Sequence, residues 1–210
     1  KPHNGQVHRP NNLIFLPQDH ALYPSSSTIE DVLAITPIIA ALKQIEQGDI
    51  NDSALELAND NWNIRATIKQ IFHSLKLNDI SLSTSFHSLS GGEKTKILIA
   101  YTLLHPADFI LFDEPTNNLD KSTRQFLYHH IQQQTAGLIV ASHDRQLLNL
   151  MDHIIELQPN GITHYGGNFD FYQQQKQIQH QALQRDYRDA VKSVQQNEKQ
   201  AQLISIFSRS

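Results

Sequence analysis

A run of four apolar residues that ends in two adjacent carboxylates constrains the fold of this chain more than any other feature. The run is residues 109–112, and the carboxylates are Asp113 and Glu114. Continuous apolar runs suit a buried parallel strand, and the carboxyl end of such a strand opens into a ligand crevice in open α/β sheets. Acidic side chains there can serve a metal ion and a water molecule. The run therefore predicts an α/β fold with a site at one edge of its sheet.

A second feature, at residues 89–93, reads Leu-Ser-Gly-Gly-Glu. It stands just ahead of a helical pattern that places apolar residues on one side, namely Ile97, Tyr101 and Leu104. The start of a helix presents free backbone N–H groups together with the positive end of the helix dipole. This segment therefore predicts a place for phosphate oxygens.

Two further apolar runs end in polar residues. Residues 13–16 lead toward Gln18. Residues 138–141 lead toward His143. We predict both runs as strands, the second one buried, whose ends lie at the same sheet edge as Glu114. Gln18 and His143 are therefore candidates for the same site.

The stretch between the first two predicted strands follows helical periods. Ser27 and Glu30 have the spacing of a capping box at a helix start. Apolar residues at one-turn and two-turn spacing predict another helix over residues 64–75. We expect the neighbouring Trp62 to pack rather than to bind. The stretch of about residues 27–88 is thus predicted to be a helical subdomain.

Composition narrows the class of protein. The chain has 39% hydrophobic residues, and no apolar run approaches a membrane span, so we expect no membrane insertion. The absence of cysteine excludes a disulfide scaffold and favours a cytoplasmic location. The 12 histidines share no metal-ligand spacing with cysteines, so we expect no metal cage made by protein alone.

The last part of the chain is a glutamine-rich helical pattern. Residues 173–210 hold six basic against three acidic residues, although the whole chain has a net charge of −4. Apolar residues recur there at alternating spacings of four and three, which predicts a weak coiled-coil seam. The seam comprises Leu183, Tyr187, Ala190, Val194, Ala201 and Ile204, with Asn197 in register. A solvated helix packed on its own domain is the alternative.

These motifs together resemble the ATP-binding cassette (ABC) family. Residues 89–93 resemble its signature motif, and residues 109–114 resemble its Walker B strand with the catalytic glutamate. Residues 115–120 resemble its D-loop, His143 its switch histidine and Gln18 its Q-loop glutamine. The resemblance implies a partial ABC-type nucleotide-binding domain, with a P-loop NTPase-like mixed or parallel sheet, a helical subdomain and a C-terminal coiled-coil helix.

The resemblance also implies ATP and Mg²⁺ as cofactors. Asp113 would hold Mg²⁺ directly or through water, and Glu114 would orient and polarise the attacking water. Gln18 and His143 would contact the γ-phosphate region, with Gln18 also sensing Mg²⁺. Asp120 would couple two sites. The nucleotide-binding residues of the signature would be Ser90, Gly91, Gly92 and Glu93.

One element of the family is missing from the sequence. The phosphate loop Gly-x-x-x-x-Gly-Lys-Ser/Thr does not occur, and the nearest string, residues 91–95, has a glutamate between glycine and lysine. We therefore expect a fragment that starts after the phosphate loop. In the family each ATP is held by the phosphate loop of one cassette and the signature of another. The chain would bring half of two sites, would need a second cassette, and is not expected to hydrolyse ATP alone.

The C-terminal helix resembles the inter-cassette linker of the ABC-F branch, whose tandem cassettes act on ribosomes. Residues 117–120 and 141–145 also resemble that branch. We expect residues 1–167 to form the truncated cassette and residues 168–210 the linker, with ribosomal RNA as a partner. Two features depart from the pattern of the family. Lys96 stands where the family usually carries arginine, and the predicted linker is rich in glutamine rather than strongly basic. The sequence leaves open whether the parent is a translation factor or an antibiotic-resistance protein.

Two other classes share the nucleotide motifs. The ATPase subunit of a membrane transporter differs in coupling to a transmembrane partner, and the long helix that starts near Tyr172 argues against it. A chromosome-organising ATPase also joins a coiled coil to a split cassette. Its coil should precede the signature, whereas here the helical pattern follows His143.

Overall fold

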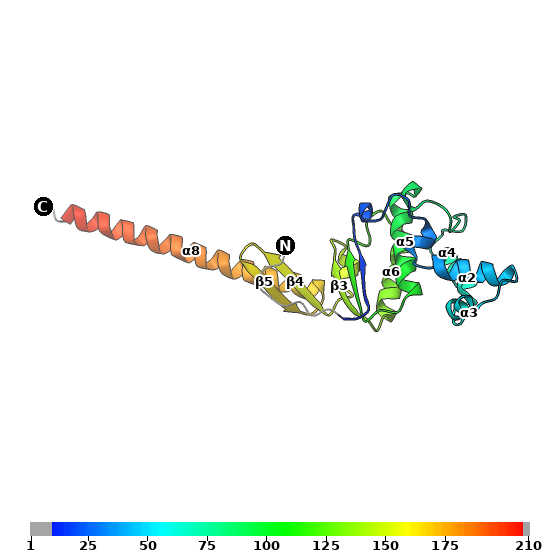
Figure 1. Ribbon diagram of the computed structural model, residues 1–210. Helices are drawn as coiled ribbons and strands as arrows, with labels where there is room; N and C mark the ends of the chain where they lie inside the picture. Colours follow the sequence, from blue (N-terminus) through cyan, green and yellow to red (C-terminus); the bar gives the residue numbers. More distant parts are fainter. Residues whose placement is uncertain (1–9, 208–210) are drawn as a thin grey trace. The chain divides into compact units, whose positions relative to one another are not determined.

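The computed structural model describes the backbone of residues 10–207 and the side chains of residues 10–196, and the chain divides into two compact units (Figure 1). The first unit ends at Asp144 and the second begins at Arg145. The second unit includes a hairpin that the predicted division at residue 167 gives to the cassette. That division stays a prediction.

A parallel sheet of three strands, in the order β1-β2-β3, forms the centre of the first unit. The strands are β1 (Leu13–Leu16), β2 (Phe109–Asp113) and β3 (Gly137–Ala141). Leu16 pairs with Phe112, which pairs in turn with Val140, so the carboxyl ends of the strands lie side by side. The predicted α/β class with a parallel sheet is confirmed.

The two faces of this sheet differ in burial. Helices α5 (Gly91–Leu104) and α6 (Lys121–Gln133) lie on one side of the sheet (Figure 1). The strand residues Ile14, Leu16, Ile110 and Phe112 share one face, and all four are buried. The opposite face carries a cross-strand row of Phe15, Leu111 and Ile139. Phe15 is 51% exposed and Ile139 is 53% exposed. The prediction that residues 138–141 form a buried strand is therefore wrong, because β3 is the last strand of the described sheet and one of its faces is open.

Helix α5 is buried on more than one side. Ile97, Leu98, Ile99 and Ala100 are consecutive residues and all are buried. The helix contacts β1 on the sheet and also α1 and α4 of the helical region. A one-sided apolar pattern underestimates this burial, because the helix lies between two layers.

The helical region lies between β1 and α5 in the sequence. Its elements are η1 (His20–Leu22), α1 (Ile29–Val32), α2 (Thr36–Glu46), α3 (Asp52–Ala58), α4 (Ile64–Ser74) and η2 (Phe86–Ser88). An antiparallel bridge joins Thr28 to Ser85, and the N–H of Phe86 donates to the carbonyl of Ser27 over 2.9 Å. These contacts join the two ends of the helical region, close to its predicted limits of residues 27 and 88.

Two details of the helical region differ from prediction. The capping box uses Thr28 and Asp31, one residue later than the predicted pair of Ser27 and Glu30. Trp62 is 54% exposed, so the expectation that it packs is wrong. The predicted helix over residues 64–75 is confirmed as α4, with Ile68 and Phe72 buried.

The second unit joins a short helix, a β-hairpin and one long helix. These are α7 (Arg145–Leu148), β4 (His153–Gln158), β5 (Gly161–Gly166) and α8 (Phe169–Phe207). The carboxylate of Glu156 on β4 accepts hydrogen bonds from Lys176 Nζ at 3.0 Å and from the hydroxyl of Tyr172 at 3.1 Å. Lys176 lowers the pKa of Glu156. These contacts fix the first turns of α8 to the hairpin.

The predicted C-terminal helix is confirmed, whereas the coiled coil stays a prediction. Leu183, Tyr187 and Val194 are exposed by 67%, 71% and 56%. The side chains of Asn197, Ala201 and Ile204 lie outside the described residues. Across the described part of the chain, every helix is too short or too polar to cross a membrane.

Candidate functional site

Three predicted site residues meet at the carboxyl end of the sheet. Asp113 ends β2, Glu114 follows it, and Gln18 lies two residues beyond the end of β1. The pairing of Leu16 with Phe112 puts these strand ends next to each other. Gln18, Asp113 and Glu114 line one small pocket of about 160 Å³. The structure thus brings together a carboxamide and two carboxylates.

His143 approaches the same edge from β3. It lies two residues beyond Ala141, which pairs with Asp113. The backbone N–H of His143 donates to Glu114 Oε2 over 3.4 Å, and His143 Nε2 lies 3.4 Å from Glu114 Oε1. The side chain of Glu114 is 14% exposed and that of His143 is 98% exposed. The imidazole therefore meets the carboxylate from the solvent side.

The backbone of Glu114 is unusual. Its φ is +48°, in the left-handed region that non-glycine residues rarely adopt. The N–H of Glu114 donates to the carbonyl of Ala141 over 2.8 Å, which holds this turn against the neighbouring strand. Strained residues of this kind cluster at functional sites. The strain here coincides with the predicted catalytic carboxylate.

The signature segment forms the capped start of α5. Ser90 is the N-cap, and Glu93 Oε2 accepts from the N–H of Ser90 at 2.8 Å and from its hydroxyl at 2.6 Å. The hydrogen bonds from Ser90 lower the pKa of Glu93. Gly91 and Gly92 occupy the first helical positions, whose N–H groups have no acceptor within a helix. The segment thus offers amide donors, while Ser90 and Glu93 are engaged with each other.

Asp120 is the N-cap of α6 rather than a member of the small pocket. Its Oδ1 accepts from the N–H of Thr123 at 3.0 Å, and its Oδ2 accepts from the Thr123 hydroxyl at 2.9 Å. The Ser122 hydroxyl also donates to it. The bonds from Ser122 and Thr123 hold the pKa of Asp120 well below its usual range. Asp120 is therefore ionised at neutral pH.

Eight lining residues of the small pocket were not predicted as site residues. They are Leu16, Pro17, His20, Thr95, Leu98, Pro115, Asn117 and Asn118. Thr95 and Leu98 come from α5, and the two asparagines come from the loop after β2, so the pocket joins three segments that are distant in sequence. Burial, followed by the charge of Lys94, lowers the pKa of His20. The turn-rich run at residues 115–120 was the signal that points to the asparagines.

The residues of the pocket suit Mg²⁺. Carboxylate and amide oxygens are the hard donors that this ion prefers, and Asp113, Glu114 and Gln18 supply them in one place. Mg²⁺ also keeps several waters and uses phosphate oxygens as further ligands, so one or two protein carboxylates suffice. The donor set therefore fits a magnesium ion that arrives with a nucleotide.

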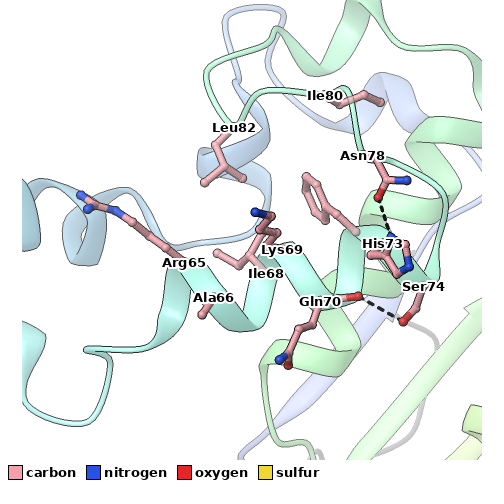
Figure 2. A pocket seen from close by; sticks show the side chains of 11 residues that line it. Arg65, Ala66, Ile68, Lys69, Gln70, His73, Ser74, Asn78, Ile80 and Leu82 are labelled. Atoms are coloured by element: carbon pink, nitrogen blue, oxygen red, sulfur yellow. Dashed lines mark hydrogen bonds between the residues drawn. The ribbon is translucent and has the colours of Figure 1, made fainter.

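A larger groove lies away from these residues. It runs along α4, and its apolar lining includes Ile68, Ile80 and Leu82 (Figure 2). Its volume is about 930 Å³. Arg65 and Lys69 stand at its side, and His73 Nδ1 lies 3.2 Å from Asn78 Oδ1. None of the predicted site residues lines this groove, so its size does not mark the site.

The sequence profile of the ABC transporter family matches residues 2–117, which is more than half of the chain. The chain belongs to the ABC transporter family of ATP-binding domains. The strand-end carboxylates and the capped signature helix are thus parts of an ABC-type ATP-binding cassette. ATP and Mg²⁺ are the usual ligands of such domains.

The curated relatives that resemble this chain include a ribosome protection protein and ATP-binding proteins of uncharacterised role. The chain is 35% identical over 124 residues to the ribosome protection protein VmlR of Bacillus subtilis, covering 59% of this chain and 23% of that protein. It is 33% identical over 131 residues to the uncharacterised ABC transporter ATP-binding protein YfmR of the same organism, covering 61% and 20%. It is 30% identical over 142 residues to the probable ATP-binding protein YheS of Escherichia coli, covering 66% and 22%. The chain thus spans about a fifth of the length of these relatives.

Solved structures share the fold. The ATP-binding subunit of an ABC transporter matches with a TM-score of 0.57 at 19% identity, over 80% of this chain and 63% of that one. A dimeric ATP-binding cassette in a post-hydrolysis state, bound to ADP and Pi, matches with a TM-score of 0.53 at 20% identity, over 74% and 62%. These likenesses establish the ABC ATPase fold.

Proposed function

We propose that this cassette takes part in ATP hydrolysis, with its sheet edge serving one ATP and its signature serving another. The observation that carries the proposal is the small pocket in which Gln18, Asp113 and Glu114 meet, with His143 against Glu114. A bound Mg²⁺ would supply charge that stabilises the transferring phosphoryl group.

Each residue of this pocket has a separate role in the proposal. Asp113 holds Mg²⁺ directly or through water, and Gln18 senses the ion from the neighbouring strand. Glu114 orients and polarises the attacking water, for which a carboxylate with 14% exposure is well placed. His143 contacts the γ-phosphate region, and its backbone N–H donates to the side-chain carboxylate of Glu114. Asp120 couples this site to the second one.

The phosphate loop and the partner signature come from outside these 210 residues in this proposal. The chain has no Gly-x-x-x-x-Gly-Lys-Ser/Thr string, and its relatives are much longer, since the 131 residues that match YfmR are only 20% of that protein. Ser90, Gly91 and Gly92 then close over an ATP that a second cassette holds. Glu93 supports them as the partner of Ser90 in the capping box.

We further propose a tandem-cassette ATPase of the ABC-F type that acts on ribosomes in the cytoplasm. The similarity to VmlR, a ribosome protection protein, supports this role. The long helix α8 supports it as well, since its exposed face carries Arg185, Arg188 and Lys192, which suit a phosphate backbone. The alternative is the ATPase subunit of a membrane transporter, which needs a transmembrane partner instead.

Co-sedimentation separates these roles. The full-length protein with Glu114→Gln, which keeps ATP bound, should sediment with purified ribosomes in ATP and not with protein-free lipid vesicles. Replacement of Arg185, Arg188 and Lys192 by glutamine should weaken ribosome binding at least about tenfold near physiological salt, because three phosphate contacts are lost. A control that changes Arg185 and Arg188 to lysine keeps the charge and should bind normally. Sedimentation with membranes that contain a transporter, and not with ribosomes, would establish the alternative.

A further inference from the structure

Lys96 on the signature helix has a mostly buried side chain whose charged end meets a carboxylate. Its side chain is 12% exposed, and its Nζ lies 3.1 Å from Asp120 Oδ2. The side chain of Asp120 is 47% exposed, so the buried stem of Lys96 leads its ammonium to a carboxylate at the surface. The partner lies 24 residues further along the chain, at the start of α6. The ion pair therefore joins two helices.

A second contact joins the same two segments. A Cβ on Gly92 would lie 2.6 Å from the backbone oxygen of Asn118, so only glycine lets the loop approach this closely. The Cβ position of Gly91 lies 3.3 Å from Asn118 Nδ2. Asn118 itself has a φ of +60°, which turns the loop toward the helix. Because Gly92 and Lys96 are one helical turn apart, both contacts lie along the first turns of α5.

The loop is also tied to the helix that follows it. Asp120 uses both carboxylate oxygens, accepting from Thr123 as well as from Lys96. The Nε of Arg124 donates to the carbonyl of Leu119 over 3.2 Å, and Leu119 is buried. A displacement of residues 117–120 would therefore have to break the cap of α6 together with the ion pair.

We propose that Lys96 is a positioning residue: its ion pair with Asp120 locks the signature turn of α5 to residues 117–120, so that both segments move as one body. This inference rests on the proposed function, because it gives the lock the task of aiming the Gly91 and Gly92 amides at the ATP of the partner cassette. Lys96 touches neither ATP nor the reacting atoms in this account.

Backbone ¹⁵N relaxation on the full-length protein tests the lock without ATP. In the unchanged chain, residues 91–93 and 117–119 should have order parameters of about 0.85, the value of rigid backbone. Lys96→Met should lower both sets toward about 0.6 and leave β2 unchanged, whereas Lys96→Arg should keep them high. Lys94→Met, on the same helix, is the control and should have no effect. If Lys96→Met does not fold, Asp120→Asn replaces it, since asparagine retains the cap acceptor.

Two results would overturn the lock. One is an unchanged order parameter in both segments for Lys96→Met, and the other is an equal loss in β2, which would indicate a general loss of stability.

In the full-length protein, Lys96→Met should lower kcat about tenfold with unchanged Kd for ATP, and Lys96→Arg should restore kcat. If the lock fails while Glu114→Gln still abolishes hydrolysis, the proposed function stands without it. If the lock holds while Glu114→Gln has no effect, the proposed function fails.

Discussion

The two faces of the three-stranded sheet are made from the same kinds of residue but have different surroundings. Phe112 on the helix-covered face is 3% exposed, whereas Phe15 on the opposite face is 51% exposed. Ile110 and Ile139 repeat this contrast at 2% and 53%. The covered face holds the strands in register and so fixes where Asp113 and Glu114 emerge. The difference shows that the site depends on one layer of packing, supplied by α5 and α6.

Phenylalanine replacement should give the largest contrast between the faces. Phe112→Ala removes a buried ring and should lower the free energy of unfolding by about 4 kcal/mol, since a cavity remains beneath the helices. Phe15→Ala should lower it by about 1 kcal/mol or less, because that ring is already half in water. Urea unfolding followed by circular dichroism measures both. Equal losses would mean that the open face is also covered.

Isoleucine replacement sharpens the comparison with a smaller side chain. Ile110→Ala should cost about 3 kcal/mol of unfolding free energy, as the side chain is fully enclosed. Ile139→Ala should cost less than about 1 kcal/mol, within the range of strand propensity at an exposed position. The same unfolding experiment applies. A larger loss for Ile139 than for Ile110 would reverse the assignment of the faces.

Acidification should lower the free energy of unfolding, because it protonates Asp120, the N-cap of α6 on the helix-covered side of the sheet. The pKa of Asp120 is lowered in the folded state, so the unfolded chain takes up a proton at a higher pH than the folded one. The stabilisation is therefore present above the ordinary aspartate pKa of about 4 and is lost as the pH falls below it. Unfolding curves from pH 7 to pH 2 should show a shallower decline for Asp120→Asn than for the unchanged chain. Parallel declines would remove Asp120 as a source of the pH dependence.

Strand-end chemistry was predictable from the sequence, whereas burial and distant contacts were not. The apolar run before Asp113 and Glu114 predicts β2 because its pattern is local. The same reasoning fails for residues 138–141, because periodicity cannot tell whether a second layer covers a strand. The capping box was displaced by one residue because Ser27 and Thr28 are adjacent and both can cap a helix.

Contacts between distant segments carry no local signal. Lys96 was visible in the sequence only as a departure from the family's usual arginine. Its ion pair with Asp120 requires α5 and α6 to lie side by side, which spacing along the chain does not reveal. The approach of Asn118 to Gly92 depends on the same packing. Motif spacing therefore located the parts of the site but not the connections between them.

ATP hydrolysis by the full-length protein carrying Glu114→Gln tests the central claim most directly. The glutamine keeps the size of the side chain but cannot act as a base, so steady-state hydrolysis should fall at least about tenfold while ATP remains bound. In the proposed two-site arrangement both sites should stop, because the closed pair of cassettes would have to open before either ATP is exchanged. Glu56→Gln, at an exposed position on α3, is the control and should hydrolyse ATP normally. Hydrolysis by Glu114→Gln within about twofold of the unchanged protein would contradict the account.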